Sequence, residues 1–261
     1  MRYLKLLRAF YKNALLEELE YRANFVVNVF TNAFTLFWAI FALQIYFNHT
    51  QTIGGWTYDE ALIVIGVFNF ANGFMESFLR PNVSELGDHV RLGTLDLLLT
   101  KPINSQFMVS ARKVSFWHLS DMLLGIGVIV LALVRMNFTL TALQVLAFIV
   151  LTVAAGMMLY AIAFLLSTSA LWFVRIDNIL EVFSAFYEAG RVPITVYRGA
   201  VRVVLTFIVP IAFMTTFPAA ALINKLDWVY ALTGVALALA LFALSAFFWR
   251  FALRSYSSAS S

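Results

Sequence analysis

Two runs of the sequence hold 22 residues each without a charged side chain, Val145 to Leu166 and Trp228 to Trp249. A helix needs about 20 mostly apolar residues to cross the hydrocarbon core of a bilayer. Membrane β-barrels instead use shorter segments of alternating hydrophobicity. The whole chain is 62% hydrophobic and only 12% charged, whereas soluble domains have about 25% charged residues. These features predict a polytopic all-α membrane protein and exclude a disordered chain or a nucleic-acid-binding domain.

Three further segments qualify as membrane spans because they are long and nearly uncharged. They are Phe25 to Phe47, with three amide side chains, Ala61 to Leu79, with one acid, and Val114 to Val134, with His118 and Asp121 near its start.

Residues 168–227 permit two interpretations. In one, residues 176–190 form a polar fifth span, and residues 203–223, which Pro210 and Pro218 interrupt, form a re-entrant element. In the other, residues 203–223 are themselves the fifth span and residues 168–202 form a cytoplasmic loop. Both interpretations give six transmembrane helices and place the two termini on one side of the membrane.

Basic residues predict the orientation. Twelve of the 18 Lys and Arg lie before the first span, between the second and third, or after the last, namely Arg2, Lys5, Arg8, Lys12, Arg22, Arg80, Arg91, Lys101, Arg112, Lys113, Arg250 and Arg254. Since cytoplasmic loops carry an excess of Lys and Arg, these segments and both termini are predicted to be cytoplasmic. Residues 1–22 place apolar and basic side chains on different helical faces, which predicts an amphipathic interfacial helix near anionic headgroups; an ordinary cytoplasmic helix is the alternative.

Motifs for nucleotide, metal or nucleophile chemistry are missing from the sequence. It has no G-x-x-x-x-G-K-[ST] loop for nucleotide phosphates and no G-x-S-x-G elbow. It has no Cys, and His49, His89 and His118 are scattered rather than spaced as metal ligands. We therefore predict no catalytic residue and no metal site. A pump of this kind would take its energy from a partner or from an ion gradient.

Polar side chains recur along single faces of three apolar segments. An ionised side chain at the centre of a span costs roughly 2.5–3.5 kcal/mol, so such residues need an explanation. One interpretation is a shared translocation path for a cationic or zwitterionic cargo; the other is helix–helix packing, with Glu76 paired to Arg80, Glu188 to Arg191, and His118 and Asp121 forming an interfacial pair. The candidate path residues are Asn28, Asn32, Asn69, Asn72, Glu76, Asp177, Glu181 and Glu188.

The longest polar cytoplasmic segment, residues 80–113, surrounds the apolar stretch Leu95 to Leu99. Gly93 and Thr94 can start a short helix there, with Asp96 near its positive end, and Pro102 would end it. Such a helix could dock into a groove on another protein. A plain interfacial connector is the alternative.

The segment from Arg91 to Pro102 resembles the G-T-L-[DE]-x-L-L-x-x-P segment of ABC-2-type transporter permeases. Residues 192–197, 209–210 and 217–220 resemble the P-I-x-x-Y…P…P-A region of one branch, the single-domain six-span permeases that include viologen exporters. The ending from Trp249 to Ser258 is also similar to that branch. Arg198 departs from the pattern, since a second Pro is expected there. With the basic start and the spans, the resemblance covers the whole chain, 1–261, as one transmembrane domain.

This resemblance implies a permease without catalytic activity or cofactor of its own. Two permease subunits, identical or paralogous, would work with two cytoplasmic ATPase subunits, which bind ATP and Mg, among the lipids of the bacterial inner membrane. The segment near residues 85–102 would be a coupling helix that docks on the ATPase, through Leu86, Arg91, Gly93, Leu95, Asp96 and Pro102. Residues 191–226 would form a re-entrant helical pair that closes the outer mouth, with gate residues Pro193, Tyr197, Pro210 and Pro218.

The hypothesis is therefore a permease subunit of an ATP-driven exporter, which moves an amphipathic and cationic substrate out of the cytoplasm. Export of a glycolipid, polysaccharide or peptide fits the same architecture. A proton-driven secondary transporter with Glu76, Asp121 and Glu181 as carriers is a rival. A membrane-embedded lipid enzyme is a second rival, for which the sequence offers no nucleophile and base.

Overall fold

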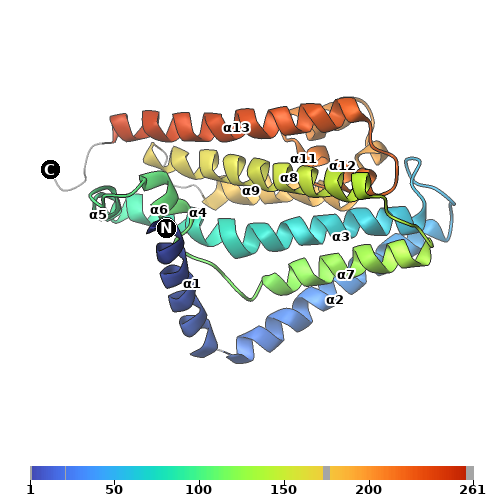
Figure 1. Cartoon of the computed structure of the whole chain (residues 1–261), viewed down its shortest axis with the longest axis horizontal. Coiled ribbons are helices and arrows are strands. Elements are labelled where there is room, and N and C mark those ends of the chain that lie inside the picture. Colours follow the sequence, from blue (N-terminus) through green and yellow to red (C-terminus); the bar gives the residue numbers. More distant parts are fainter. Residues whose placement is uncertain (1, 21, 173–176, 257–261) are drawn as a thin grey trace.

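The computed structural model describes residues 2–20, 22–172 and 177–256, and the side chains of residues 2, 22 and 177–180 lie outside this description. Four helices run side by side along the long axis of an all-helical bundle (Figure 1), namely α3 (Tyr58–Phe74), α7 (Leu119–Arg135), α8 (Ala142–Thr168) and α13 (Trp228–Ser255). Within the described residues, four helices are long and apolar enough to cross a membrane: Ala23–Phe47, Tyr58–Arg91, Ala142–Leu171 and Trp228–Ser255.

The second of these helices consists of three pieces in one continuous rod, α3 (Tyr58–Phe74), a π-helical turn (Met75–Leu79) and α4 (Arg80–Arg91). A capping box between Thr57 and Glu60 starts it. The helix therefore continues past Leu79, where we expected a cytoplasmic loop to begin. The π turn explains why the helix tolerates a proline. The Arg80 N–H donates to the Met75 carbonyl, five residues earlier, so the regular pattern of backbone hydrogen bonds is already interrupted just before Pro81, which has no N–H to donate.

The pair formed by α3 and α7 (Leu119–Arg135) is the most closely packed in the bundle. Gly66 and Gly125 face each other, and a methyl group added to Gly125 would lie 2.5 Å from the Gly66 carbonyl oxygen. The two backbones therefore touch, as small residues allow in membrane bundles.

Helix α7 begins later than the predicted span at Val114. Residues 111–118 instead run as irregular chain beside the π turn, where Ser115 N–H donates to the Ser77 carbonyl.

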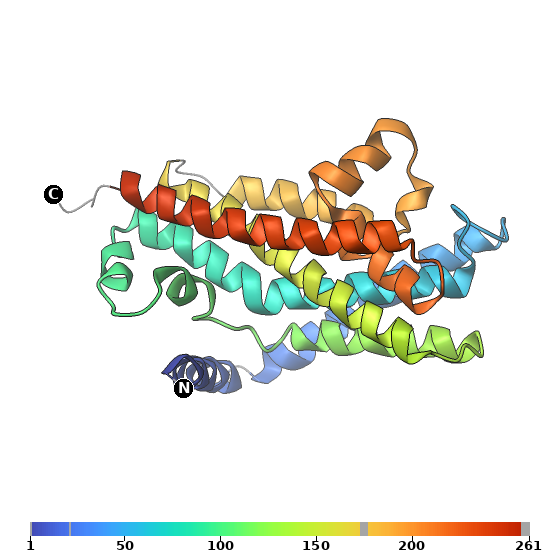
Figure 2. The same ribbon diagram turned by 45° about the horizontal axis from the view of Figure 1, so that its top comes forward.

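The remaining long helices are α2 (Arg22–Phe47), α8 (Ala142–Thr168) and α13 (Trp228–Ser255). Helices α8 and α13 pack along each other, and both begin at capped residues, Thr141 and Asp227. Helix α2 packs on α3 and α7, and its outer face carries exposed Phe and Trp side chains. It lies at the lower edge of the bundle in Figure 1, and in the turned view of Figure 2 it passes behind α7.

Residues 177–223 form a series of short helices. Helix α9 (Asp177–Tyr187) and the 3-10 turn Glu188–Arg191 are followed by η4 (Ile194–Val196), α10 (Gly199–Val203), the π turn Val204–Ile208, α11 (Ile211–Met214) and α12 (Thr216–Leu222). A helix of 11 residues extends about 16 Å, so α9 alone does not cross a bilayer. Residues 203–223 are likewise not one straight helix. The prediction of six full spans is therefore not confirmed.

The end of the bundle at which α13 finishes also carries α5 (Leu95–Leu99) and α6 (Ser105–Ser110) (Figure 1). The amphipathic start is helix α1 (Arg2–Glu20), which crosses the bundle axis at a steep angle (Figure 1). Its inner face packs through Phe10 and Tyr11, and both Glu18 carboxylate oxygens accept from the Phe116 N–H at 2.9 and 3.0 Å. Burial raises the pKa of the Glu18 carboxyl, because it outweighs this hydrogen bond.

Candidate functional site

A polar cavity of about 370 Å³ lies on the flank of the bundle, between α2, the α3–π-turn rod, the start of α7, and α9. Its walls contribute carboxylates, amides, an imidazole, two hydroxyls and a guanidinium. The lining residues are Asn32, Asn72, Met75, Glu76, Arg80, His118, Asp121, Ser184, Tyr187 and Glu188. So dense a set of ionisable groups beside apolar helices makes this cavity the candidate functional site.

Arg80 joins two walls of the cavity. Its guanidinium lies 3.4 Å from Glu76, one turn earlier on its own helix, and 3.4 Å from Glu181 on α9. It also donates to the Ser184 hydroxyl at 3.2 Å. The predicted pair within one helix is therefore part of a bridge between helices. Glu181 is 72% exposed, so this carboxylate lies at the outside of the chain, beside the Arg80 wall of the cavity.

The start of α7 supplies a second ionisable pair. His118 Nδ1 lies 3.2 Å from a carboxylate oxygen of Asp121, whose side chain is buried. Asn69 on α3 donates to the Asp121 carbonyl at 2.8 Å, which fixes the beginning of α7 against α3. Since α7 starts beside Gly73, this pair lies within the bundle rather than at its end.

The opposite end of the cavity is closed by aromatic rings and a third ion pair. Tyr187 is fully buried and stacks on Phe68, with ring centroids 4.9 Å apart. Arg191 binds Glu188 through two contacts of 2.5 and 3.1 Å, and its guanidinium carbon lies 5.1 Å from the centre of the Phe68 ring. Phe68 is eight residues from Glu76, about 12 Å along the helix.

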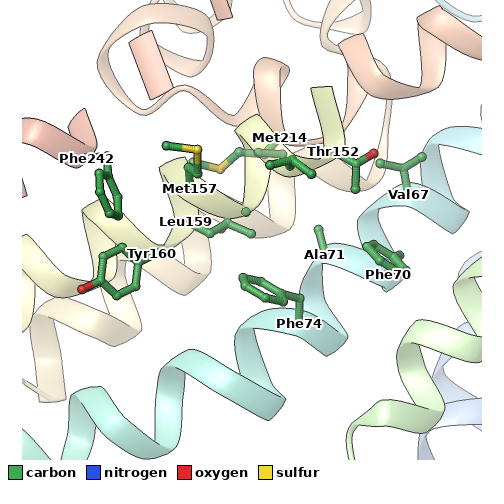
Figure 3. Close-up of a pocket in the computed structure, with 13 residues that line it drawn as sticks. Val67, Phe70, Ala71, Phe74, Thr152, Met157, Leu159, Tyr160, Met214 and Phe242 are labelled. Atoms are coloured by element: carbon green, nitrogen blue, oxygen red, sulfur yellow. The ribbon is translucent and has the colours of Figure 1, made fainter. Parts of the chain in front are cut away.

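A second cavity, of about 430 Å³, lies on another face of α3 and is apolar. Phe70 and Phe74 of α3 face Leu159 and Tyr160 of α8 across it (Figure 3). The Tyr160 hydroxyl is held by Gln106 and Ser110 of α6. The residues that line this groove carry no charged group, so it suits an apolar chain. The α3 rod thus separates an apolar groove from a polar cavity.

Of the predicted path residues, the structure brings Asn32, Asn72, Glu76 and Glu188 together in the polar cavity, with Glu181 beside its Arg80 wall. Asn69 and Asn28 make packing contacts instead, Asn28 donating to the Asn24 carbonyl of its own helix. The Asp177 side chain lies outside the described part of the chain.

The prediction omitted Arg80, Ser184 and Tyr187 from the path and assigned His118 and Asp121 to the interface. Helical periodicity places Arg80 on the same helix face as Glu76, and Ser184 on the same face as Glu188. The sequence therefore contained the information needed to include both residues in the predicted path.

At the other predicted site, the short helix α5 begins after Gly93, which has a left-handed φ of 67°, and ends before Pro102. Leu86 and Leu95 are buried, so they hold the helix in place and do not offer a docking surface. Leu92 and Leu97 are exposed instead.

Two of the predicted docking side chains, Arg91 and Asp96, have partners within the chain. Arg91 pairs with Asp88 at 2.7 Å. Burial, and then the charge of the nearby Asp96 carboxylate, raise the pKa of the Tyr256 hydroxyl, so Asp96 faces the C-terminal segment.

The predicted gate residues lie in the series of short helices. Pro193 and Pro210 precede helical turns, and Pro218 lies buried in α12. The Tyr197 hydroxyl donates to the Ala189 carbonyl at 3.1 Å, and Ile194 N–H donates to the Thr216 hydroxyl at 3.0 Å. These bonds join the turn after α9 to α12.

Comparison with known families matches residues 33–260 to the family described as ABC-2 family transporter protein. Comparison with curated proteins finds no match, and neither does comparison with solved structures.

Proposed function

The chain belongs to the ABC-2 transporter family, and we propose that it is the permease subunit of an ATP-driven exporter. It works with a separate cytoplasmic ATPase, which binds ATP and Mg, and it moves an amphipathic cation out of a bacterial cell. The long apolar helices and the polar cavity are the transporting part. The chain has no nucleotide-binding loop, so the energy comes from the partner.

The observation that carries the proposal is the attachment of α5 to the rod that lines the cavity. Leu95 and Leu98 of α5 are buried against Leu86 of α4, Phe164 of α8 and Trp249 of α13. A push on α5 therefore acts on three long helices at once. Leu97, 67% exposed, points away from this cluster and offers an apolar contact to the ATPase. Movement of the α3–α4 rod then changes the shape of the polar cavity.

The open flank supports a second permease subunit. An exposed carboxylate and guanidinium at the depth of apolar helices are costly beside lipid. A second subunit, identical or paralogous, would cover the opening between α2 and α9, and its own helices would complete the path. Backbone groups that lack helical hydrogen bonds need protein or water around them inside a membrane. The interrupted helices of residues 191–226 would therefore border the water-filled path, where they form the outer gate.

Basic residues support the orientation. Arg91 ends α4, Lys101 follows α5, and Arg250 and Arg254 lie in the last turns of α13, and these segments share one end of the bundle (Figure 1). The positive-inside rule makes this end cytoplasmic. In this arrangement the membrane part consists of six elements, which are the four long helices, α7 and the α9 region. The six-span permeases that include viologen exporters have this plan.

The charges of the cavity favour a cationic cargo. Four carboxylates, of Glu76, Asp121, Glu181 and Glu188, face two guanidinium groups, of Arg80 and Arg191, and one imidazole. An excess of negative charge in a partly enclosed site attracts cations. Glycolipid, polysaccharide and peptide remain alternative cargoes for the same architecture.

The experiment that tests this function is purification of the tagged chain from its native membranes in a mild detergent. We expect an ATP-hydrolysing protein to co-purify in equal amount. Leu97→Asp should abolish the association, because a charge replaces the exposed apolar contact, and should leave the unfolding temperature unchanged. Leu140→Asp is the matched control, an exposed Leu in the loop between α7 and α8, and should retain the ATPase.

Absence of any ATPase from the wild-type preparation would contradict the proposal. Transport by the purified chain alone, driven by a proton gradient, would favour the secondary transporter.

A further inference from the structure

Arg191 makes the contacts that an organic cation would make. Its guanidinium lies over the Phe68 ring at 5.1 Å and binds both oxygens of the Glu188 carboxylate. An aromatic face combined with a carboxylate is the arrangement by which proteins bind delocalised and quaternary cations. Here the chain fills that arrangement with its own side chain.

The place of this contact is the end of the polar cavity farther from Arg80. Glu188 and Tyr187 both line the cavity, and the Tyr187 ring stacks on the ring that Arg191 covers. Glu188 is the group shared by the cavity and the Arg191 contact, because its carboxylate belongs to the lining and also binds Arg191. Arg191 itself is 38% exposed, so a cation in the cavity can compete with it for Glu188.

The turn that carries Arg191 connects the cavity to the predicted gate. It is a 3-10 turn between α9 and η4, and Gly190 in it packs so tightly on α11 that an added methyl would lie 2.8 Å from Ile211. The next bonds, from Ile194 N–H to Thr216 and from Tyr197 to Ala189, join the turn to α12 and η4. Arg191 thus adds a contact between this turn and Phe68 of α3, next to the stacking of Tyr187 on the same ring.

We propose that Arg191 occupies the binding site for the cationic group of the cargo, and that the cargo displaces it from Glu188 and Phe68. The cargo class is an organic cation with a delocalised or quaternary charge. When the cargo binds, the turn Glu188–Arg191 loses this contact with α3. The predicted gate segment, residues 191–226, can then move in response to cargo binding. The role of the bound cation as a cargo rests on the proposed transport function. Binding of the cation at this site can be tested with the chain alone.

The test is titration calorimetry of the purified full chain with phenyltrimethylammonium, with tert-butylbenzene as the uncharged isostere. Arg191→Gln removes the competing cation, so we expect the dissociation constant for phenyltrimethylammonium to fall about tenfold, as when a site that is blocked for most of the time becomes free. Arg191→Lys retains a cation and should bind as the wild type does. Phe68→Leu added to Arg191→Gln should remove the gain. The isostere should bind all variants equally.

Equal or weaker binding by a folded Arg191→Gln chain would overturn the proposal, and so would an equal gain for the uncharged isostere. Unfolding temperatures of all variants identify any misfolded one, and Arg191→Met then serves as the second uncharged variant. If the chain co-purifies with its ATPase but shows no gain, only this inference fails. If the gain is present and no ATPase associates, the cation site stands and the exporter proposal fails.

Discussion

At the scale of single residues, one buried amide side chain joins the α3–α4 rod to the irregular segment that leads into α7. Asn82 on α4 accepts from the Lys113 N–H at 2.8 Å and donates to the carbonyls of Lys113 and Phe78 at 2.7 and 2.8 Å. It is 2% exposed. The side chain thus pairs with backbone groups of a segment that has no helical ladder of its own, beside the residues that lead to His118.

Replacing Asn82 by Ala should lower the stability of the purified chain. The variant leaves the Lys113 N–H and two carbonyls without their partner, and each unsatisfied buried group costs about 1–3 kcal/mol. Thermal unfolding in detergent, followed by circular dichroism, measures the effect. Asn48→Ala is the control, because Asn48 is exposed and bonds only to Gln44 through its side chain. An unfolding temperature equal to that of the control would show that water replaces the amide.

The ion pairs of the cavity differ in how far they could be predicted. Glu76 and Arg80 are four residues apart on one helix, so their contact follows from local spacing. The contacts of Arg80 with Glu181 and of Asn82 with Lys113 join segments distant in the sequence, and no pattern along the chain specifies them.

At the scale of elements, the contact between α3 and α7 depends on the absence of side chains. Gly66 and Gly73 on α3, and Gly125 on α7, let the backbones meet, and a methyl group at Gly73 would lie 2.7 Å from the Met122 nitrogen. This contact places Asp121 against α3 and so forms one wall of the polar cavity.

Gly125→Ala should separate α3 from α7, because its methyl would meet the backbone of Gly66 and Phe70 at 2.5 and 2.6 Å. Overpacking of this kind costs typically 1–3 kcal/mol, so the unfolding temperature should fall. Gly127→Ala is the matched control two residues away, since nothing lies within 4 Å of its added methyl. A Gly125→Ala chain as stable as the control would mean that the two helices are farther apart than described.

Helices α8 and α13 could be predicted because their apolar runs are long and end at capping residues. The continuation of α3 through Pro81 was predicted wrongly as a loop, because a charged residue followed by proline is typical of a helix end. A π turn depends on the packing of the whole rod and has no local signature. The late start of α7 was missed for the same reason, since residues 111–118 are fixed by bonds to the rod.

At the scale of the whole molecule, the bundle has two unlike sides. On one, α8 and α13 pack along each other beside the apolar groove. On the other, α2 stands with its aromatic face uncovered, next to the opening of a charged cavity. A membrane protein gains nothing from exposing Glu181 and Arg80 to lipid. If the chain works as the proposed permease, we expect a partner subunit on the α2 side and lipid on the α8 and α13 side.

Single cysteines test this arrangement with little background, since the natural chain has none. Thr31→Cys, Phe34→Cys and Trp38→Cys place a thiol on the exposed face of α2, and Leu232→Cys is the control on the exposed face of α13. If the second permease is a copy, mild oxidation in membranes should give a disulfide-linked dimer with at least one α2 variant, because the two thiols then lie within disulfide reach. The α13 control should stay monomeric. A dimer formed equally by the α13 control would show random collision, whereas monomers throughout, with the ATPase present, would mean that a different chain covers the cavity.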